Sequence, residues 1–238
     1  MNYYTILPYE EYPKVMTRKK YPILYILILL LLACVQQSHG QSKDSNILNR
    51  HIKDLTIRDQ NINLALSRIA GDYHIPIGLE MVPGEGGAVE KNIKLDIKDS
   101  TCREILDAIV EQDDRYEWKL TDGVVNVYPK ANRDAILQDV LATKVKRFSL
   151  DKNTSLYRAR VNIVEVPEIK SKLKDHQITP FIVAFTGIDY QKLGNDFSMN
   201  VSDVTLQEIL NQIIKQSATK YWIVNRYGEN HEFLILNF

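Results

Sequence analysis

The sequence has little cysteine, and neither sign of charge is in excess. It has two cysteines in 238 residues, Cys34 and Cys102, and 30 basic residues against 30 acidic ones. Without a basic surplus the chain gives no sign of binding nucleic acid, and without an acidic run it has no solvating tail. A chain with so few cysteines must depend on its hydrophobic core for stability.

The sequence has one long hydrophobic run. It is YPILYILILLLLACV (21–35), and it follows the basic stretch TRKK (17–20). Fifteen helical residues span about 22 Å, which is less than the bilayer core of about 30 Å. A basic stretch, a short apolar stretch and the polar QQSHG together predict an export signal over residues 1–40 rather than a membrane anchor. Met16, just before the basic stretch, would be a conventional start for such a signal.

Two processing sites fit this signal, and the sequence leaves both open. LLAC (31–34) resembles a bacterial lipobox, in which Cys34 would become the lipidated first residue. Small residues ending at Gly40 would instead allow ordinary cleavage before Gln41. In both cases we expect an exported protein of the periplasm or cell envelope, either soluble or lipid-anchored at Cys34.

Removal of residues 1–40 changes the charge and the cysteine content only slightly. It takes away four basic and two acidic residues, which leaves 26 and 28 and a net charge of about −2. Such a small charge predicts no particular partner. Cys102 is then the one remaining cysteine, so no disulfide within the chain is expected.

A repeated phrase organises the rest of the sequence. DSTCREILDAIV (99–110) and DVTLQEILNQII (203–214) match at a constant offset of 104 residues. A threonine followed three residues later by a glutamate predicts a capping box at the start of a helix. An aspartate before each cap is expected to favour the helix dipole. The repeated positions, all interpreted as structural, are Asp99, Thr101, Glu104, Trp118, Asp203, Thr205, Glu208 and Trp222.

The first copy predicts the order strand, helix, strand, strand, helix, hairpin. The strands are expected at 52–58, 75–82 and 92–98, and the first helix at 61–74, from their apolar spacing. The capping box begins the second helix, and Asp122-Gly123 predicts a tight hairpin turn between YEWKL and VVNVYP. The glycine-rich PGEGG (83–87) is expected to be a loop, because neither a helix start nor a lysine-serine pair follows it.

The second copy repeats this order less clearly. KRFSL (146–150) and PFIVAF (180–185) predict its first two strands, and Pro167 predicts the start of a helix. LYRARVNIVEV (156–166) fits a helix or a strand. KYWIV and HEFLILNF predict a second hairpin around Gly228.

The predicted fold is therefore α+β, with two tandem modules that each pack two helices on small mixed β-sheets. The modules are expected at 50–130 and 146–238, after a linker at 41–49. Residues 131–145 between them have a helical pattern, which predicts a rigid connection.

The first module resembles the secretin and TonB short N-terminal domain. The resemblance covers residues 50–130 and lies in INLALSRIAGDYHIPIGLE and in IKLDIKDSTCREILDAIVEQDDRYEWKLTDGVVNVYP. Residues 146–238 resemble a second, divergent copy. The resemblance implies an exported bacterial module that docks to an envelope protein, such as a secretin, a TonB-linked receptor or a membrane regulator. The expected role is docking without a pore.

Several side chains suggest chemistry, and each is better interpreted as structural. Cys102 could be a reactive thiol at a helix start, but Leu206 occupies the matching position, so an apolar contact is expected. The acidic residues Glu111, Asp113 and Asp114 could pair for hydrolysis but are expected to form a solvated patch. The five histidines have no metal-ligand spacing, so no metal or cofactor is expected. The two tryptophans could bind a sugar or a peptide, but their strands place them as core anchors.

The sequence thus predicts a non-enzymatic docking or adaptor protein of the cell envelope. Strand addition at an exposed sheet edge is the expected mode of binding. The expected edge is the last strand, with Phe233, Leu234 and Leu236. A ligand-binding or cell-wall-binding protein that uses a cleft between the modules is the alternative.

Overall fold

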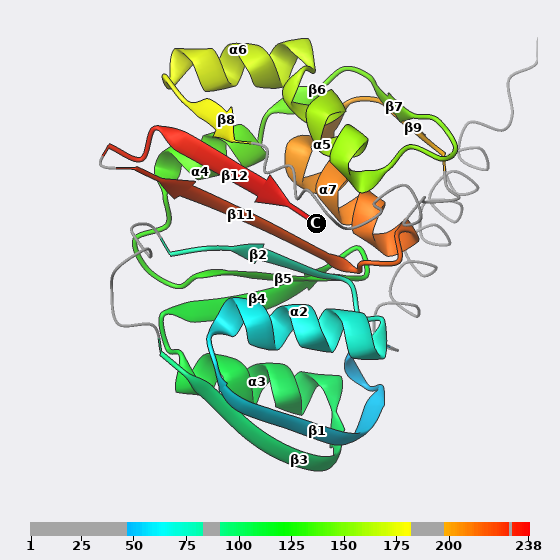
Figure 1. The fold of residues 1–238 in the computed structure, drawn as a ribbon, viewed down its shortest axis with the longest axis vertical. Coiled ribbons are helices and arrows are strands. Elements are labelled where there is room, and N and C mark those ends of the chain that lie inside the picture. The colour runs from blue at the N-terminus through cyan, green and yellow to red at the C-terminus, as the bar shows by residue number, and fades with distance from the viewer. Residues whose placement is uncertain (1–46, 83–90, 182–197, 229) are drawn as a thin grey trace, which may run out of the picture. The chain divides into compact units, whose positions relative to one another are not determined.

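The structure, a computed structural model, describes residues 47–82, 91–181, 198–228 and 230–238. The predicted export signal with Cys34, Gly40 and Gln41, the PGEGG loop, and residues 182–185 of the predicted strand 180–185 lie outside the described residues. Residues Gln41–Phe238 form one compact unit. Helices and mixed sheets make up this unit, which confirms the predicted α+β class (Figure 1).

The first half has the predicted order of elements. The elements are β1 (His51–Gln60), α2 (Ile62–Tyr73), β2 (Ile77–Glu80), β3 (Ile93–Thr101), α3 (Cys102–Gln112), β4 (Tyr116–Thr121) and β5 (Val124–Pro129). Asp122 and Gly123 both have positive φ, 50° and 75°, as the tight turn between β4 and β5 requires.

In the described residues, the second half has one helix more than the first. After the connecting helix α4 (Ala135–Leu141) come β6 (Lys144–Val145), β7 (Phe148–Leu150), α5 (Leu156–Val164), α6 (Pro167–Asp175), β8 (Thr179–Phe181), β9 (Met199–Val201), β10 (Val204–Thr205), α7 (Leu206–Gln216), β11 (Tyr221–Tyr227) and β12 (Phe233–Asn237). The ambiguous stretch 156–166 is therefore mainly helix, and Pro167 is the first residue of α6. In chain order, α5 and α6 lie between β7 and β8, as α2 lies between β1 and β2.

Strands of both halves form one six-stranded sheet, in the order β4-β5-β2-β11-β12-β8. The halves join where β2 and β11 pair in parallel, with Ile77 opposite Tyr221 and Leu79 opposite Ile223. Three two-stranded ribbons, β1-β3, β6-β10 and β7-β9, complete the described strands. The sequence predicted separate small sheets, and the structure differs because the two hairpins share a sheet through β2.

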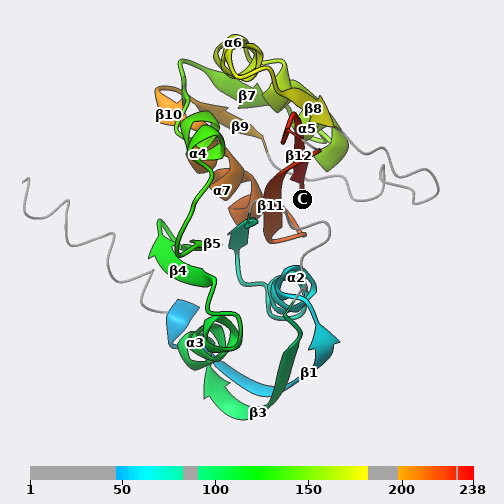
Figure 2. The same cartoon turned by 90° about the vertical axis from the view of Figure 1, so that its left-hand side faces the viewer.

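The two halves have their cores on opposite faces of this sheet. In β11, Tyr221 belongs to the core of the first half, whereas its neighbour Trp222 belongs to the core of the second. Side chains alternate between the faces of a strand, so α2 and α3 cover one face and α7 the other. Figures 1 and 2 both show α2 and α3 with the first half, away from α5, α6 and α7.

Both predicted capping boxes are present. Thr101 and Thr205 each accept a hydrogen bond from the backbone of the glutamate three residues later, and each glutamate accepts one in return. Asp99 and Asp203 have positive φ, 55° in both cases. Aspartate tolerates this left-handed backbone better than most residues, which explains its repetition more directly than the helix dipole does.

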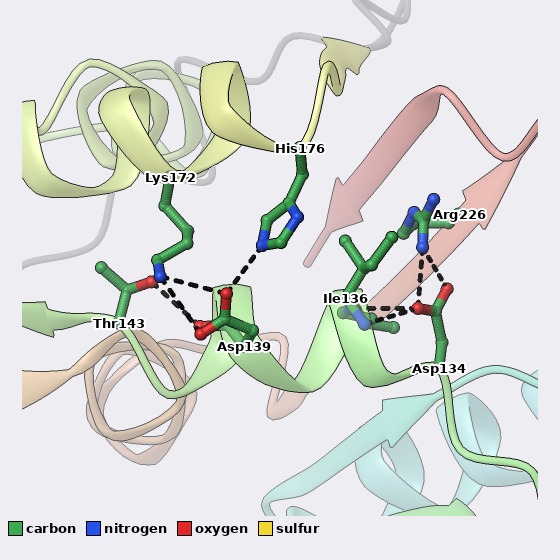
Figure 3. Close-up of polar contacts among 8 residues, drawn as sticks. Asp134, Ile136, Asp139, Thr143, Lys172, His176 and Arg226 are labelled. Atoms are coloured by element: carbon green, nitrogen blue, oxygen red, sulfur yellow. Dashed lines mark hydrogen bonds and ion pairs between the residues drawn. The ribbon is translucent and has the colours of Figure 1, made fainter.

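Helix α4 is bound to both halves by ion pairs at its start. Arg133 pairs with the buried Glu80 of β2, with 2.5 Å between Nη2 and Oε2. Asp134 caps α4 by accepting hydrogen bonds from the backbone of its first turn. Its carboxylate also pairs with Arg226 of β11 at 2.7 Å (Figure 3). Within the predicted helical connection 131–145, residues Ala135–Leu141 are helix, and the start of this helix is bound to the sheet on both sides of the β2–β11 junction.

A second, more exposed group of charges joins α4 to α6. Asp139 of α4 lies 2.6 Å from Nε2 of His176 and 3.0 Å from Nζ of Lys172 (Figure 3). The hydrogen bond with His176, and then that with Lys172, lowers the pKa of the Asp139 carboxyl below its ordinary value. The group is half exposed, so it orients α6 and contributes less to stability than the buried pair does.

We expect Asp134→Ala to lower the free energy of unfolding by about 3–5 kcal/mol, because it leaves the guanidinium of Arg226 buried without a counter-charge. The side chains of Arg226 and Asp134 are only 7% and 9% exposed. Urea denaturation followed by circular dichroism measures the effect. Asp139→Ala, on the same helix, is the control and should have a clearly smaller effect. Equal effects of the two variants would contradict the importance of the buried pair.

Candidate functional site

The sheet has two edges in the described residues, β4 and β8, and β12 is not one of them. The prediction of a docking edge at Phe233, Leu234 and Leu236 is therefore wrong. Strand β12 pairs with β11 on one side and with β8 on the other, and Leu234 and Leu236 are buried in the core of the second half. Alternating apolar residues are typical of interior and edge strands alike, so the sequence did not separate the two cases.

Strand β8 is poorly suited to accept a further strand. The backbone N–H of Thr179 donates to Glu232 O at 2.8 Å, so Thr179 and Phe181 direct their main-chain groups towards β12. Pro180 then faces the outer side and has no N–H to donate. A proline in this position is a common means of protecting a sheet edge.

Strand β4 offers a free row of main-chain groups. It pairs with β5, and Lys130 N donates to Arg115 O at 2.8 Å at one end of this hairpin. In an antiparallel pair, alternate residues bond to the neighbouring strand, so Glu117 and Lys119 bond to β5. Trp118 and Leu120 then direct their N–H and C=O groups outward. Within the described strands, no other one pairs with this side of β4.

The Trp118 side chain lies beside this edge, between β4 and α3. Its Nε1–H donates to Asp107 Oδ1 of α3 at 2.9 Å, and the guanidinium of Arg103 lies 5.4 Å from the ring centroid. The ring is half-buried. It borders a shallow hollow that is also lined by Leu48, Arg103, Asp107, Val110, Glu117, Lys119 and Leu120.

The repeat contains the same arrangement in a buried form. Trp222, 1% exposed, donates its Nε1–H to Asn211 Oδ1 of α7 at 2.8 Å. Asn211 and Asp107 are also 104 residues apart, so both halves use the same tryptophan-to-helix hydrogen bond. The expectation of a core anchor holds fully for Trp222 and only in part for Trp118. In the sequence, the match of Asp107 with Asn211 at the same offset of 104 was the signal for this hydrogen bond, and a comparison of apolar positions alone does not include it.

Cys102 is in the core rather than at a reactive surface. Its side chain is fully buried, and burial raises the pKa of its thiol to about 11. The structure thus agrees with the apolar contact that Leu206 indicated at the matching position.

The acidic residues after α3 do not converge on one point. Asp113 is fully buried and forms two hydrogen bonds of 2.6 Å with Arg115, so it is not part of a solvated patch as expected. Asp114 pairs instead with Lys91, whose hydrogen bond lowers the pKa of the Asp114 carboxyl. Glu111 is exposed on α3. Each of the two aspartates thus has its own basic partner, as is typical of structural ion pairs.

The described histidines are also held separately. His51 lies 3.1 Å from Asp99, and His176 belongs to the Asp139 group. Among the residues that the structure describes, no three His, Cys, Asp or Glu side chains are placed to hold a metal ion. The helices of this part of the chain are all too short or too polar to cross a bilayer.

No model of a known protein family matches the chain. A search of curated proteins likewise gives no significant match.

We expect Cys102 to react with a thiol reagent far more slowly in the folded protein than in urea. At pH 8 a thiol of pKa about 11 is thiolate in about one molecule in a thousand, and the core also excludes the reagent. The rate measured with a disulfide reagent in a Cys34→Ser background should rise about tenfold per pH unit up to about pH 11 and level off above it, and unfolding should raise it strongly. Rapid labelling of the folded protein at pH 8 would contradict this placement.

Proposed function

We propose that this chain is a non-enzymatic, exported envelope protein that docks to a partner protein by strand addition at the free edge of β4. The main support is that the main-chain N–H and C=O groups of Trp118 and Leu120 point outward from the edge of β4. The half-buried ring of Trp118 and a shallow hollow lie beside them. The resemblance to the secretin and TonB short N-terminal domain favours a secretin, a TonB-linked receptor or a membrane regulator as the partner.

The second half of the chain supports this mode of binding, because it uses the same edge for strand pairing. Strand β11 matches β4 in the repeat, and its outer side binds β2. Ile77 N donates to Lys220 O at 2.9 Å, and Met81 N donates to Val224 O at 3.0 Å. Lys220 and Val224 correspond to Tyr116 and Leu120 of β4.

The alternative of a cell-wall or small-ligand protein has less support. Trp222 is buried, so a platform of both tryptophans is excluded for the folded unit. The β2–β11 pairing joins the halves, and the hollow that remains between them is lined by α2 and by Tyr221, Ile223 and Phe238. A ligand site would use either Trp118 or the hollow beside Tyr221, and binding to purified peptidoglycan would test both uses.

We expect Leu120→Pro to abolish binding of the envelope partner, whereas Leu120→Ala retains it. Proline removes the outward N–H but no hydrogen bond to β5, and alanine keeps the N–H while removing most of the side chain. Affinity capture of the tagged protein from the envelope, with mass spectrometry, compares both variants with the wild type. Circular dichroism and thermal unfolding must show that both variants are folded.

Two outcomes would contradict the proposal. A partner that remains bound to folded Leu120→Pro does not use the β4 edge. A partner lost equally from both variants depends on the Leu120 side chain rather than on strand addition.

A further inference from the structure

We infer that the β4 edge accepts an extended partner segment, parallel to β4, with glycine beside Trp118, a basic residue before it and an acidic residue after it. This inference rests on the proposed function and specifies its partner. It derives from the pairing of β2 with β11, which serves as an internal example of a strand added to this kind of edge.

The register of the β2–β11 pairing can be applied to β4, because β4 and β11 are matching strands of the repeat. In β11, Tyr221, Trp222 and Ile223 lie opposite Ile77, Gly78 and Leu79 of β2. Subtracting the offset of 104 gives Glu117, Trp118 and Lys119 in β4. An added strand in the same register would therefore place three consecutive residues opposite these three.

The residue opposite the tryptophan has no room for a side chain. A Cβ on Gly78 would lie 2.2 Å from Cε2 and 2.3 Å from Cζ2 of Trp222, well inside van der Waals contact. The Trp222 ring therefore covers the neighbouring strand. Trp118 makes the matching hydrogen bond to the matching residue of its helix, Asp107, so its ring covers the same place beside β4. Only glycine fits there.

Helix α3, which packs beside β4, matches α7, which packs beside both β11 and the strand paired with it. Helix α7 contacts both β11 and β2, and Gln207 at its start donates to Asn126 of β5, on the far side of β2, at 3.2 Å. Arg103 of α3 matches Gln207. Helix α3 thus extends beyond β4 as α7 extends beyond β11, and the hollow beside Trp118 lies between them.

The flanking positions differ between the copies, and this difference determines the chemistry of the partner. Tyr221 and Ile223 are packed in the core, and they face the apolar Ile77 and Leu79. The matching Glu117 and Lys119 are exposed charges. Opposite charges directly across two strands stabilise the pairing, and like charges destabilise it. A basic residue beside Glu117 and an acidic one beside Lys119 therefore suit this edge.

The outer strand β8 of a second copy would fit the β4 edge poorly. The residues of β8 are Thr179, Pro180 and Phe181, with no glycine among them and no outward N–H at the proline. We assign the partner segment to another protein, and self-association of the chain is an outcome of the test.

The probe is a labelled peptide with the sequence of residues 74–81 that carries Ile77→Lys and Leu79→Glu. Its binding to the full chain is followed by fluorescence anisotropy up to millimolar concentration. We expect the same peptide with Gly78→Ala to bind at least about tenfold more weakly, because its methyl group meets the Trp118 ring. A peptide with the two charges exchanged should bind about fivefold more weakly. In the Trp118→Ala protein, the glycine and alanine peptides should bind equally.

Three outcomes would overturn the inference. They are no binding of the glycine peptide, equal binding of the glycine and alanine peptides to the wild type, and self-association of the chain that Leu120→Pro removes. The first two leave the proposed function intact if Leu120→Pro still loses its envelope partner. The proposed function fails separately if that variant keeps the partner.

Discussion

The parallel pairing of β2 with β11 is the contact on which the rest of the structure depends. It makes one sheet from two hairpins, and it forces the two cores onto opposite faces, because Tyr221 and Trp222 point in opposite directions from adjacent positions. The buried pairs of Arg133 with Glu80 and of Asp134 with Arg226 fix α4 beside the same junction. The outer edge of β11, in the second copy, is thus covered by β2 of the first copy.

Local features of the fold could be predicted from the sequence, and the arrangement of strands could not. The capping boxes at Thr101 and Thr205 and the turn at Asp122-Gly123 depend on residues within a few positions of one another, so their pattern is sufficient. The place of β12 between β11 and β8 depends on contacts across more than fifty residues. The alternating apolar residues of β12 indicate that one face of the strand is buried. Interior strands and edge strands can both have a buried face, so this pattern does not show which of the two β12 is.

The candidate site was visible in the sequence only as a difference between the copies. Trp118 and Trp222 match, and each donates its indole N–H to a helix residue eleven positions earlier. The acceptor is a charged Asp107 in the exposed copy and a neutral Asn211 in the buried one. A buried carboxylate would be costly without a counter-charge, whereas an exposed one is not. The same contrast distinguishes Glu117 and Lys119 from Tyr221 and Ile223, so the first copy has the surface of a strand that faces water on that side.

The two free edges of the described sheet differ in the main-chain groups that they present. Pro180 removes a donor from β8 for every possible neighbour. On β4 the main-chain groups remain, and selection rests on the Trp118 ring and on the charges of Glu117 and Lys119. An apolar strand is disfavoured there because it would bury both charges, and a strand with any side chain opposite the ring is excluded by contact. If the proposed docking is correct, an edge that rejects most strands while keeping its hydrogen-bonding groups would avoid aggregation and still recognise one kind of segment.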